Sequence, residues 1–151
     1  MWNTIARNLF SIIRIGLGIS WVQQGWFKLH ANFGMSGFIE PLLHNNDVPD
    51  WFKSLMGGFV TDHIKLFEFI IPWGEFLVGI GLITGILTLP ALLTAIFMNI
   101  NYWLADMVYI YPLQLATATV ILAGIRYASY IGLQTGFIYF YRKKRMDLNN
   151  T

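Results

Sequence analysis

Ionisable side chains interrupt three of the apolar stretches of this 151-residue chain. Arg14 lies in the first stretch, Glu68 and Glu75 lie in the second, and Arg126 lies in the last. A charge near the centre of a bilayer costs about 2.5 to 3.5 kcal/mol on insertion scales, so it persists only beside a partner or water. These residues are therefore functional candidates. We expect Glu75 to pair with an arginine, and the spacing does not choose between Arg14 and Arg126.

Helical spacing gathers the charges of the first two stretches into two stripes, because residues that lie three and four positions apart share one face of a helix. The first stripe consists of Arg14, Gly18, Trp21, Gly25 and Lys28. The second consists of Glu68, Pro72, Glu75, Gly79 and Leu82. Small residues let helices approach closely, and polar faces turn away from lipid. We therefore expect the stripes to face each other, with Gly85 giving further room.

Two interpretations compete for these residues. Buried ion pairs can fix the register of helices without any ligand. Alternatively, the ionisable groups line a polar pocket that binds the head group of a quinone or an anionic substrate, or relays protons. In this second interpretation Glu75 acts in catalysis by accepting or relaying protons, Arg14 and Arg126 hold an anionic or carbonyl group, and Lys28 guides ligands at the rim. The further ligand-binding candidates are Trp21, Gln24, Glu68 and Asn99.

Composition predicts an integral membrane protein with an all-α fold. The chain is 56% hydrophobic and 12% charged, with a mean hydropathy of +0.53, whereas soluble domains are about 25% charged. A helix needs about 20 apolar residues to cross a bilayer. The sequence thus predicts a single membrane domain, a four-helix bundle with a loop at 30–63 and spans at about 9–29, 64–87, 91–111 and 113–130. Within the loop we expect a short interfacial helix near 50–57.

Charge asymmetry predicts the orientation. Four spans place both termini on one side, and cationic residues favour the cytoplasm. Arg7 and the basic tail at 142–151 therefore indicate cytoplasmic termini, and the acidic 30–63 loop then lies outside. The tail is explained by anionic lipid and requires no nucleic acid.

Several kinds of chemistry are disfavoured. The chain has no cysteine, which excludes disulfides and Cys-ligated metal or iron–sulfur centres. The histidines His30, His44 and His63 lie outside the predicted spans and lack helical ligand spacing, so we expect neither metal nor haem. A flavin or nicotinamide motif is not recognisable either. The cofactor is therefore unknown, and a redox reaction would need an external cofactor or a partner subunit.

Two segments resemble the DoxX family of small four-helix membrane proteins. The first segment runs from Arg14-Ile-Gly-Leu-Gly18 to Gln24-Gly-Trp-Phe-Lys28, and the second runs from Glu75 through Gly79 and Gly81 to Gly85. The resemblance implies a multi-pass protein of the bacterial cytoplasmic membrane, linked to redox metabolism, since the family includes the small subunit of thiosulfate:quinone oxidoreductase. The positions that match the family's motif are Arg14, Gly25, Lys28, Glu75, Gly79 and Gly85.

The resulting hypothesis is a DoxX-like membrane subunit of quinone-dependent redox metabolism, with a quinone and a redox subunit as partners. The alternative is a non-catalytic anchor or assembly subunit whose outer loop docks an extracytoplasmic enzyme. A small transporter is the third hypothesis. It would require two related halves, and the stripes of the first two spans have no counterpart in the last two.

Overall fold

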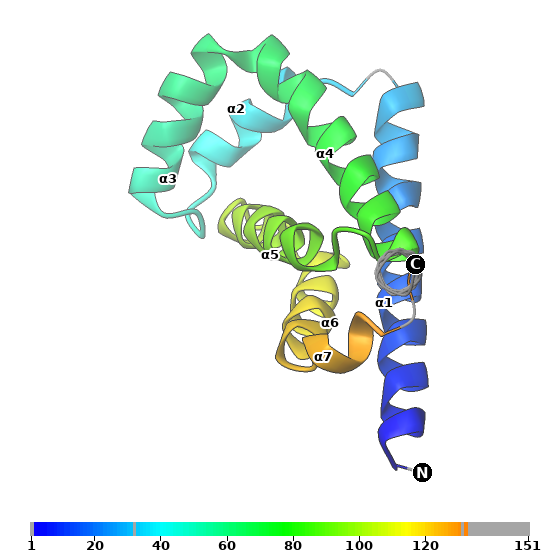
Figure 1. The fold of residues 1–151 in the computed structure, drawn as a ribbon. Coiled ribbons are helices and arrows are strands. Elements are labelled where there is room, and N and C mark those ends of the chain that lie inside the picture. Colours follow the sequence, from blue (N-terminus) through cyan, green and yellow to red (C-terminus); the bar gives the residue numbers. More distant parts are fainter. Residues whose placement is uncertain (1, 32, 131, 133–151) are drawn as a thin grey trace, which may run out of the picture.

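The computed structural model describes residues 2–31, 33–130 and 132, and every regular element within them is helical. In chain order the elements are α1 (Trp2–His30), α2 (Ser36–His44), α3 (Asp50–Leu55), the π-helix η1 (Met56–Val60), α4 (Ile64–Thr84), α5 (Thr88–Leu104), α6 (Tyr111–Ala123) and α7 (Ile125–Ala128). Figure 1 shows the long helix α1, the helix α4 that packs against it, and an arm of shorter helices at one end of α1.

Helices α1 and α4 run antiparallel and meet at glycines from the two predicted stripes (Figure 1). A Cβ atom on Gly18 would lie 2.9 Å from the carbonyl oxygen of Gly79. A Cβ on Gly25 would lie 2.5 Å from the amide nitrogen of Phe76 and 2.8 Å from the carbonyl oxygen of Pro72. The two backbones can therefore touch only because these side chains are absent. The contacts also fix the register, with Gly25 level with the turn that holds Glu75.

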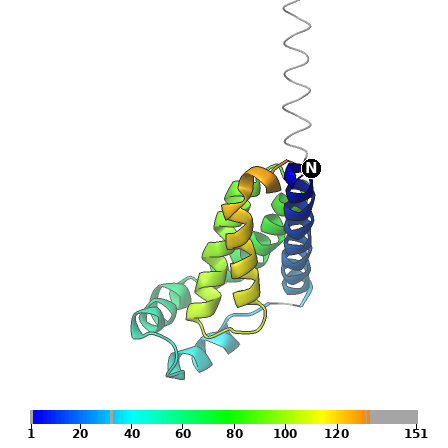
Figure 2. The same ribbon diagram turned by 90° about the horizontal axis from the view of Figure 1, so that it is seen from below.

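Helix α5 runs parallel to α1, and two hydrogen bonds set its register. Arg14 Nη1 donates to Thr88 Oγ1 at 3.4 Å, and Lys28 Nζ donates to Tyr102 Oη at 3.3 Å. Both bonds join residues 74 positions apart. The turn between α4 and α5 contains Gly85 in the left-handed region, with φ of 70°, where glycine is favoured. Figure 2 shows α5 and α6 side by side, and the Tyr102 and Tyr111 rings join them at 4.3 Å.

Residues 33–63 form an arm with a small core of its own, which packs over the end of α5. The buried side chains of this core are Met35, Ile39, Leu42, Val48, Phe52, Met56, Val60 and Ala105. The sequence predicted a loop at 30–63 with a short helix near 50–57. That prediction is partly wrong, because α2 also forms and contains Pro41. Ile39 and Leu42 bury one face of α2, and this tertiary burial outweighs the local cost of the proline.

Only part of the predicted membrane architecture appears in the described residues. Helices α1 and α4 are long and apolar enough to cross a membrane, whereas α6 is a shorter apolar helix of 13 residues. The fourth predicted span, at 113–130, is interrupted at Gly124, where the backbone leaves the helical region before α7. At a rise of 1.5 Å per residue, α6 is roughly 20 Å long, less than the hydrocarbon thickness of a bilayer. The predicted basic tail at 142–151 lies outside the described residues.

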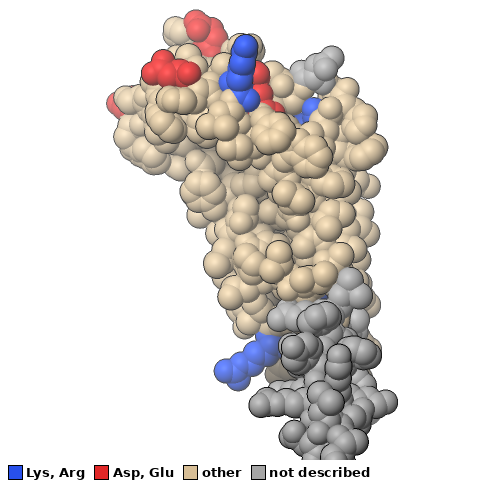
Figure 3. Space-filling model, turned by 45° about the horizontal axis from the view of Figure 1, so that its top comes forward, with Lys and Arg blue, Asp and Glu red and all other residues tan. Residues whose placement is uncertain are grey.

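The two ends of the described chain lie together. The rings of Phe10 and Tyr127 are 5.8 Å apart, and the Arg7 guanidinium lies 3.8 Å from the centre of the Tyr130 ring. The arm lies at the opposite end of α1 (Figure 1). Figure 3 shows acidic side chains gathered at the arm, where Glu40, Asp50 and Asp62 are exposed. The molecule is thus electrically asymmetric along the axis of α1.

Candidate functional site

Two side chains from two other helices converge on one carboxylate oxygen of Glu75, which lies on α4. Lys28 Nζ, from α1, lies 2.7 Å from Glu75 Oε1 in a salt bridge. Tyr102 Oη, from α5, donates to the same oxygen at 2.5 Å. The Glu75 side chain is fully buried, whereas that of Lys28 is 14% exposed. We call these three residues the Lys–Glu–Tyr cluster. Charge-assisted hydrogen bonds of this kind are the strong ones, and burial increases their strength.

The partner of Glu75 is therefore Lys28, in place of either predicted arginine. Gly25 is level with Glu75, and Arg14 lies 11 residues from Gly25, which is roughly 16 Å along α1. Lys28 lies one turn away on the other side, a distance that its long side chain spans. From the sequence we expected Lys28 at the rim of the pocket. Its contact with Glu75 depends on the register of α1 against α4, which the glycine contacts set and the sequence does not show.

Both arginines lie elsewhere. Arg14 is buried, and its guanidinium packs against the turn between α4 and α5, at Gly85 and Thr88. Arg126 is exposed on α7, next to Tyr127, which packs on Phe10. Phe10 is 15 residues from Gly25, so Arg126 lies roughly 20 Å from the level of Glu75. The expected pairing of Glu75 with one of the two arginines is therefore wrong, whereas their expected ligand-binding role stays a prediction.

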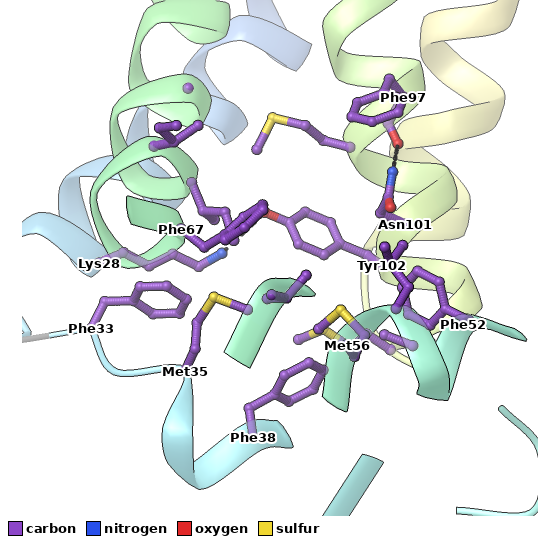
Figure 4. A pocket seen from close by; sticks show the side chains of 18 of the residues that line it. Lys28, Phe33, Met35, Phe38, Phe52, Met56, Phe67, Phe97, Asn101 and Tyr102 are labelled. Carbon is purple, nitrogen blue, oxygen red and sulfur yellow. Dashed lines mark hydrogen bonds between the residues drawn. The ribbon is translucent and has the colours of Figure 1, made fainter. Parts of the chain in front are cut away.

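An apolar cavity of about 440 Å³ opens beside the Lys–Glu–Tyr cluster, between the arm and helices α4 and α5. Figure 4 shows Lys28 and Tyr102 pointing toward each other at its wall. Most of the wall is phenylalanine, methionine and aliphatic side chains, and the polar lining residues are Lys28, Thr94, Asn101 and Tyr102. Asn101 donates to the Phe97 carbonyl oxygen of its own helix at 2.8 Å. Among the polar lining residues, Lys28 and Tyr102 are the two that contact Glu75.

Glu75 does not line this cavity but lies behind Lys28 and Tyr102. Its second carboxylate oxygen, Oε2, is buried and has no hydrogen-bond partner among the described residues. A ligand in the cavity therefore meets an ammonium and a phenol first. Glu75 contacts both of them through Oε1.

The other predicted ligand residues fall into two groups. Glu68 Oε1 accepts a hydrogen bond from the Met35 amide at 2.8 Å, so Glu68 holds the start of the arm. Trp21 and Asn99 are fully buried in the bundle, and Gln24 Nε2 donates to Ser20 Oγ at 3.3 Å. None of these four residues lines the cavity.

Sequence reasoning did not assign several residues of the site. Tyr102 carries a hydroxyl at the centre of the cluster. The sequence groups it with the polar residues of the predicted pocket, three residues after Asn99 on the same helical face, but gives it no role of its own. The apolar lining from the arm, such as Phe38 and Met56, gave no signal because its segment was predicted to be mainly loop. Met56 begins the π-helix η1, a distortion that is frequent at functional sites.

Comparisons with known proteins do not place the chain in a family. A comparison with protein-family models finds no match, and comparisons with curated proteins and with solved structures find none either. Among the described residues, histidine and carboxylate side chains do not form a group of three that could hold a metal ion. The chemistry of the site therefore rests on the Lys–Glu–Tyr cluster and its cavity.

Proposed function

We propose that the chain is a DoxX-like membrane subunit of quinone-dependent redox metabolism, and that the cavity binds the quinone. The observation that carries this proposal is the apolar cavity of about 440 Å³ whose polar residues include Lys28 and Tyr102. Ligand pockets commonly measure about 300 to 1,000 Å³ and combine apolar walls with a few polar groups that orient the ligand. The proposal keeps the predicted ligand class and moves the site from the arginines to Lys28 and Tyr102.

The donor groups favour a ligand with carbonyl oxygens. Lys28 Nζ carries three N–H donors, of which two are used by Glu75 and Tyr102 and one remains for a ligand. The Tyr102 hydroxyl gives its one hydrogen to Glu75, and its oxygen can accept. A quinone combines carbonyl acceptors with a planar ring and an apolar tail, which suit the polar end and the phenylalanine and methionine walls respectively. An anionic head group would meet only one cation there, and that cation is already paired with Glu75.

The proposed reaction adds two electrons and two protons to a quinone to give a quinol. The chain has no cysteine to hold an iron–sulfur centre, so the electrons come from a redox partner subunit. The part of this chain is to bind and orient the quinone through Lys28 and Tyr102. Glu75 replaces the protons that these two groups donate.

A multi-pass arrangement in the bacterial cytoplasmic membrane is part of the proposal. It is supported by α1 and α4, which are long and apolar enough to span, and by α5 and α6, which pack on each other within the same bundle. The exposed apolar side chains include Phe69, Leu77 and Phe97, at 62%, 61% and 67% exposure. Lipid contact accounts for such exposure. The acidic arm then lies outside, and Arg7 lies on the cytoplasmic side.

The test is binding of decylubiquinone to the purified chain in lipid nanodiscs. Tyr102→Phe removes one hydroxyl from the cluster, and Tyr109→Phe removes one from a side chain that is 94% exposed. We expect the wild type and Tyr109→Phe to bind alike and Tyr102→Phe to bind about tenfold more weakly, which corresponds to about 1.4 kcal/mol. Equal binding by all three proteins would exclude the cluster as the quinone site.

The membrane anchor is the second candidate, and the buried Lys28–Glu75 pair favours it. Buried ion pairs between helices can serve packing alone. In that case decylubiquinone does not bind the wild type at all, and the cluster variants change stability without changing any binding. The same titration thus separates the two functions.

A further inference from the structure

Behind Glu75, buried polar atoms from four helices lack hydrogen-bond partners among the described residues. They are Trp21 Nε1 and Gln24 Oε1 from α1, Glu75 Oε2 from α4, Asn99 Nδ2 and Oδ1 from α5, and Gln114 Oε1 from α6. We call these five residues the polar layer. More than about 90% of buried polar groups in proteins have a partner, in the protein or in ordered water, so such a group calls for an explanation.

The helix registers bring the polar layer together. The offset of 74 between α1 and α5 sets Asn99 level with Gly25, which is also the level of Glu75. Trp21 lies one turn away on the same face of α1, roughly 6 Å along the axis. Gln114 Nε2 donates to Ser20 Oγ at 2.7 Å, which places α6 at this same level.

The polar layer is separate from the apolar cavity. None of its five residues lines the cavity, and the lining residues Lys28 and Tyr102 contact the layer only at Glu75, through its Oε1. Trp21, Glu75 and Asn99 are fully buried. Glu75 therefore presents one carboxylate oxygen to the cluster and the other to the polar layer.

The chemistry of the unpartnered atoms selects the ligand. The indole and amide nitrogens donate, whereas the carboxylate and amide oxygens accept. A metal ion would need more carboxylate or histidine ligands, and an anion would need donors alone. Water both donates and accepts, and buried water in proteins typically makes about three hydrogen bonds to such groups. Asn99 is the strongest signal, because neither end of its amide has a partner and exchanging the two ends would not satisfy it.

We propose that the polar layer is a buried water site, in which bound water contacts Glu75 Oε2. The water gives Glu75 a source of protons on the side away from the quinone. A proton that arrives on this water from bulk solvent passes to Glu75, which leaves neutral water behind, and then passes to Lys28 or Tyr102 after either group has donated to the ligand. No electron moves in these steps. The role of the water, though not the site itself, rests on the proposed quinone function.

The experiment is X-ray hydroxyl-radical footprinting of the chain in lipid nanodiscs, read by mass spectrometry. Radicals formed from bound water oxidise the side chains beside it, and indole is a highly reactive target. Trp21 has no exposed surface, so only internal water can oxidise it, whereas Trp51 is 60% exposed to bulk solvent. Leu92 is also fully buried but lies outside the polar layer, so its oxidation rate is the reference for a part of the interior without water.

We expect Trp21 to be oxidised at a rate well above that of Leu92, each corrected for intrinsic reactivity. Asn99→Leu should lower the Trp21 rate at least threefold and leave Trp51 unchanged. The matched control is Thr119→Val, which removes an exposed hydroxyl that bonds only within α6, and it should change neither rate. If Asn99→Leu raises oxidation of Leu92, the fold has opened, and Gln114→Leu takes its place.

The proposal is overturned if Trp21 in the wild type is oxidised no faster than Leu92. It is also overturned if Trp21 is oxidised at the same rate in the wild type and in a correctly folded Asn99→Leu or Gln114→Leu variant. Neither result depends on a quinone. Decylubiquinone binding, measured on the same samples, separates failure of the water site from failure of the proposed function. Oxidised Trp21 without quinone binding would leave the water site in place and remove its proposed role.

Discussion

The Glu75 carboxylate is stabilised by donors from two other helices, and this dependence is testable. Lys28→Met removes the ammonium that lies 2.7 Å from Glu75 Oε1 and leaves a buried carboxylate uncompensated. Breaking a buried ion pair from one side costs about 3 to 5 kcal/mol. We therefore expect Lys28→Met to lower the free energy of unfolding by about that amount, measured by denaturant titration in mixed micelles.

The control for this prediction is an ion pair on the surface. Lys53 Nζ lies 3.8 Å from the fully exposed Asp50, and exposed pairs contribute about 0 to 1 kcal/mol. Lys53→Met should therefore cost less than about 1 kcal/mol. The double variant Lys28→Met with Glu75→Gln should recover part of the loss. A Lys28→Met cost as small as that of Lys53→Met would show that the buried pair does not hold the helices.

The residues of the cluster were only partly predictable from sequence. Glu75 stands out because a carboxylate inside an apolar stretch is costly. Its partner could not be chosen, because the choice depends on how α1 slides along α4, and that register is set by backbone contacts at Gly18 and Gly25. Tyr102 resembles an interfacial tyrosine until α5 is placed parallel to α1. Local patterns thus identify costly residues, whereas registers decide which of them meet.

At the scale of helices, the contact between α1 and α4 depends on glycines that can be tested in pairs. A Cβ added to Gly25 would lie 2.5 Å from the backbone of α4, whereas a Cβ added to Gly16 of the same helix would meet nothing within 4 Å. We expect Gly25→Ala to destabilise the fold by about 1 to 3 kcal/mol, as overpacking does. Gly16→Ala should be neutral or stabilising, by up to about 1 kcal/mol, because alanine favours helix.

Thermal unfolding of both glycine variants in nanodiscs provides the measurement. The two substitutions are chemically identical and lie on one helix, so the effect of helix propensity is shared. If Gly25→Ala is as stable as Gly16→Ala, the close approach of α1 and α4 is not required for folding.

The helices were predicted more reliably than the arm and the last span. The sequence places α4 at 64–87, whereas the structure ends it at Thr84, because the left-handed Gly85 stops the helix although Ile86 and Leu87 continue the apolar run. Helix α2 was missed because Pro41 and the surrounding polar residues indicate a loop, and only tertiary burial of Ile39 and Leu42 reveals it. Helix α6 ends at Ala123 although apolar residues continue beyond it. The break at Gly124 was missed because hydropathy does not detect a change in backbone conformation.

At the scale of the whole molecule, the charge asymmetry predicts an orientation. The chain has no cysteine, so single cysteines can report it without background. Asp47→Cys lies in the arm and Asn3→Cys lies near the start of α1, and both positions are exposed. We expect a membrane-impermeant maleimide to label Asp47→Cys in intact spheroplasts and Asn3→Cys only after permeabilisation. The reverse pattern would place the cavity at the cytoplasmic side.

The proposed function requires that the cavity between the arm and α4–α5 holds a quinone against Lys28 and Tyr102. The decisive experiment is photolabelling with an azido-quinone in nanodiscs, followed by peptide mapping. We expect labels on cavity residues from both walls, Met35 and Met56 from the arm and Met98 from α5, and we expect excess decylubiquinone to suppress them. Labels that resist competition, or that fall only on exposed side chains such as Phe69 and Leu77, would contradict quinone binding in this cavity.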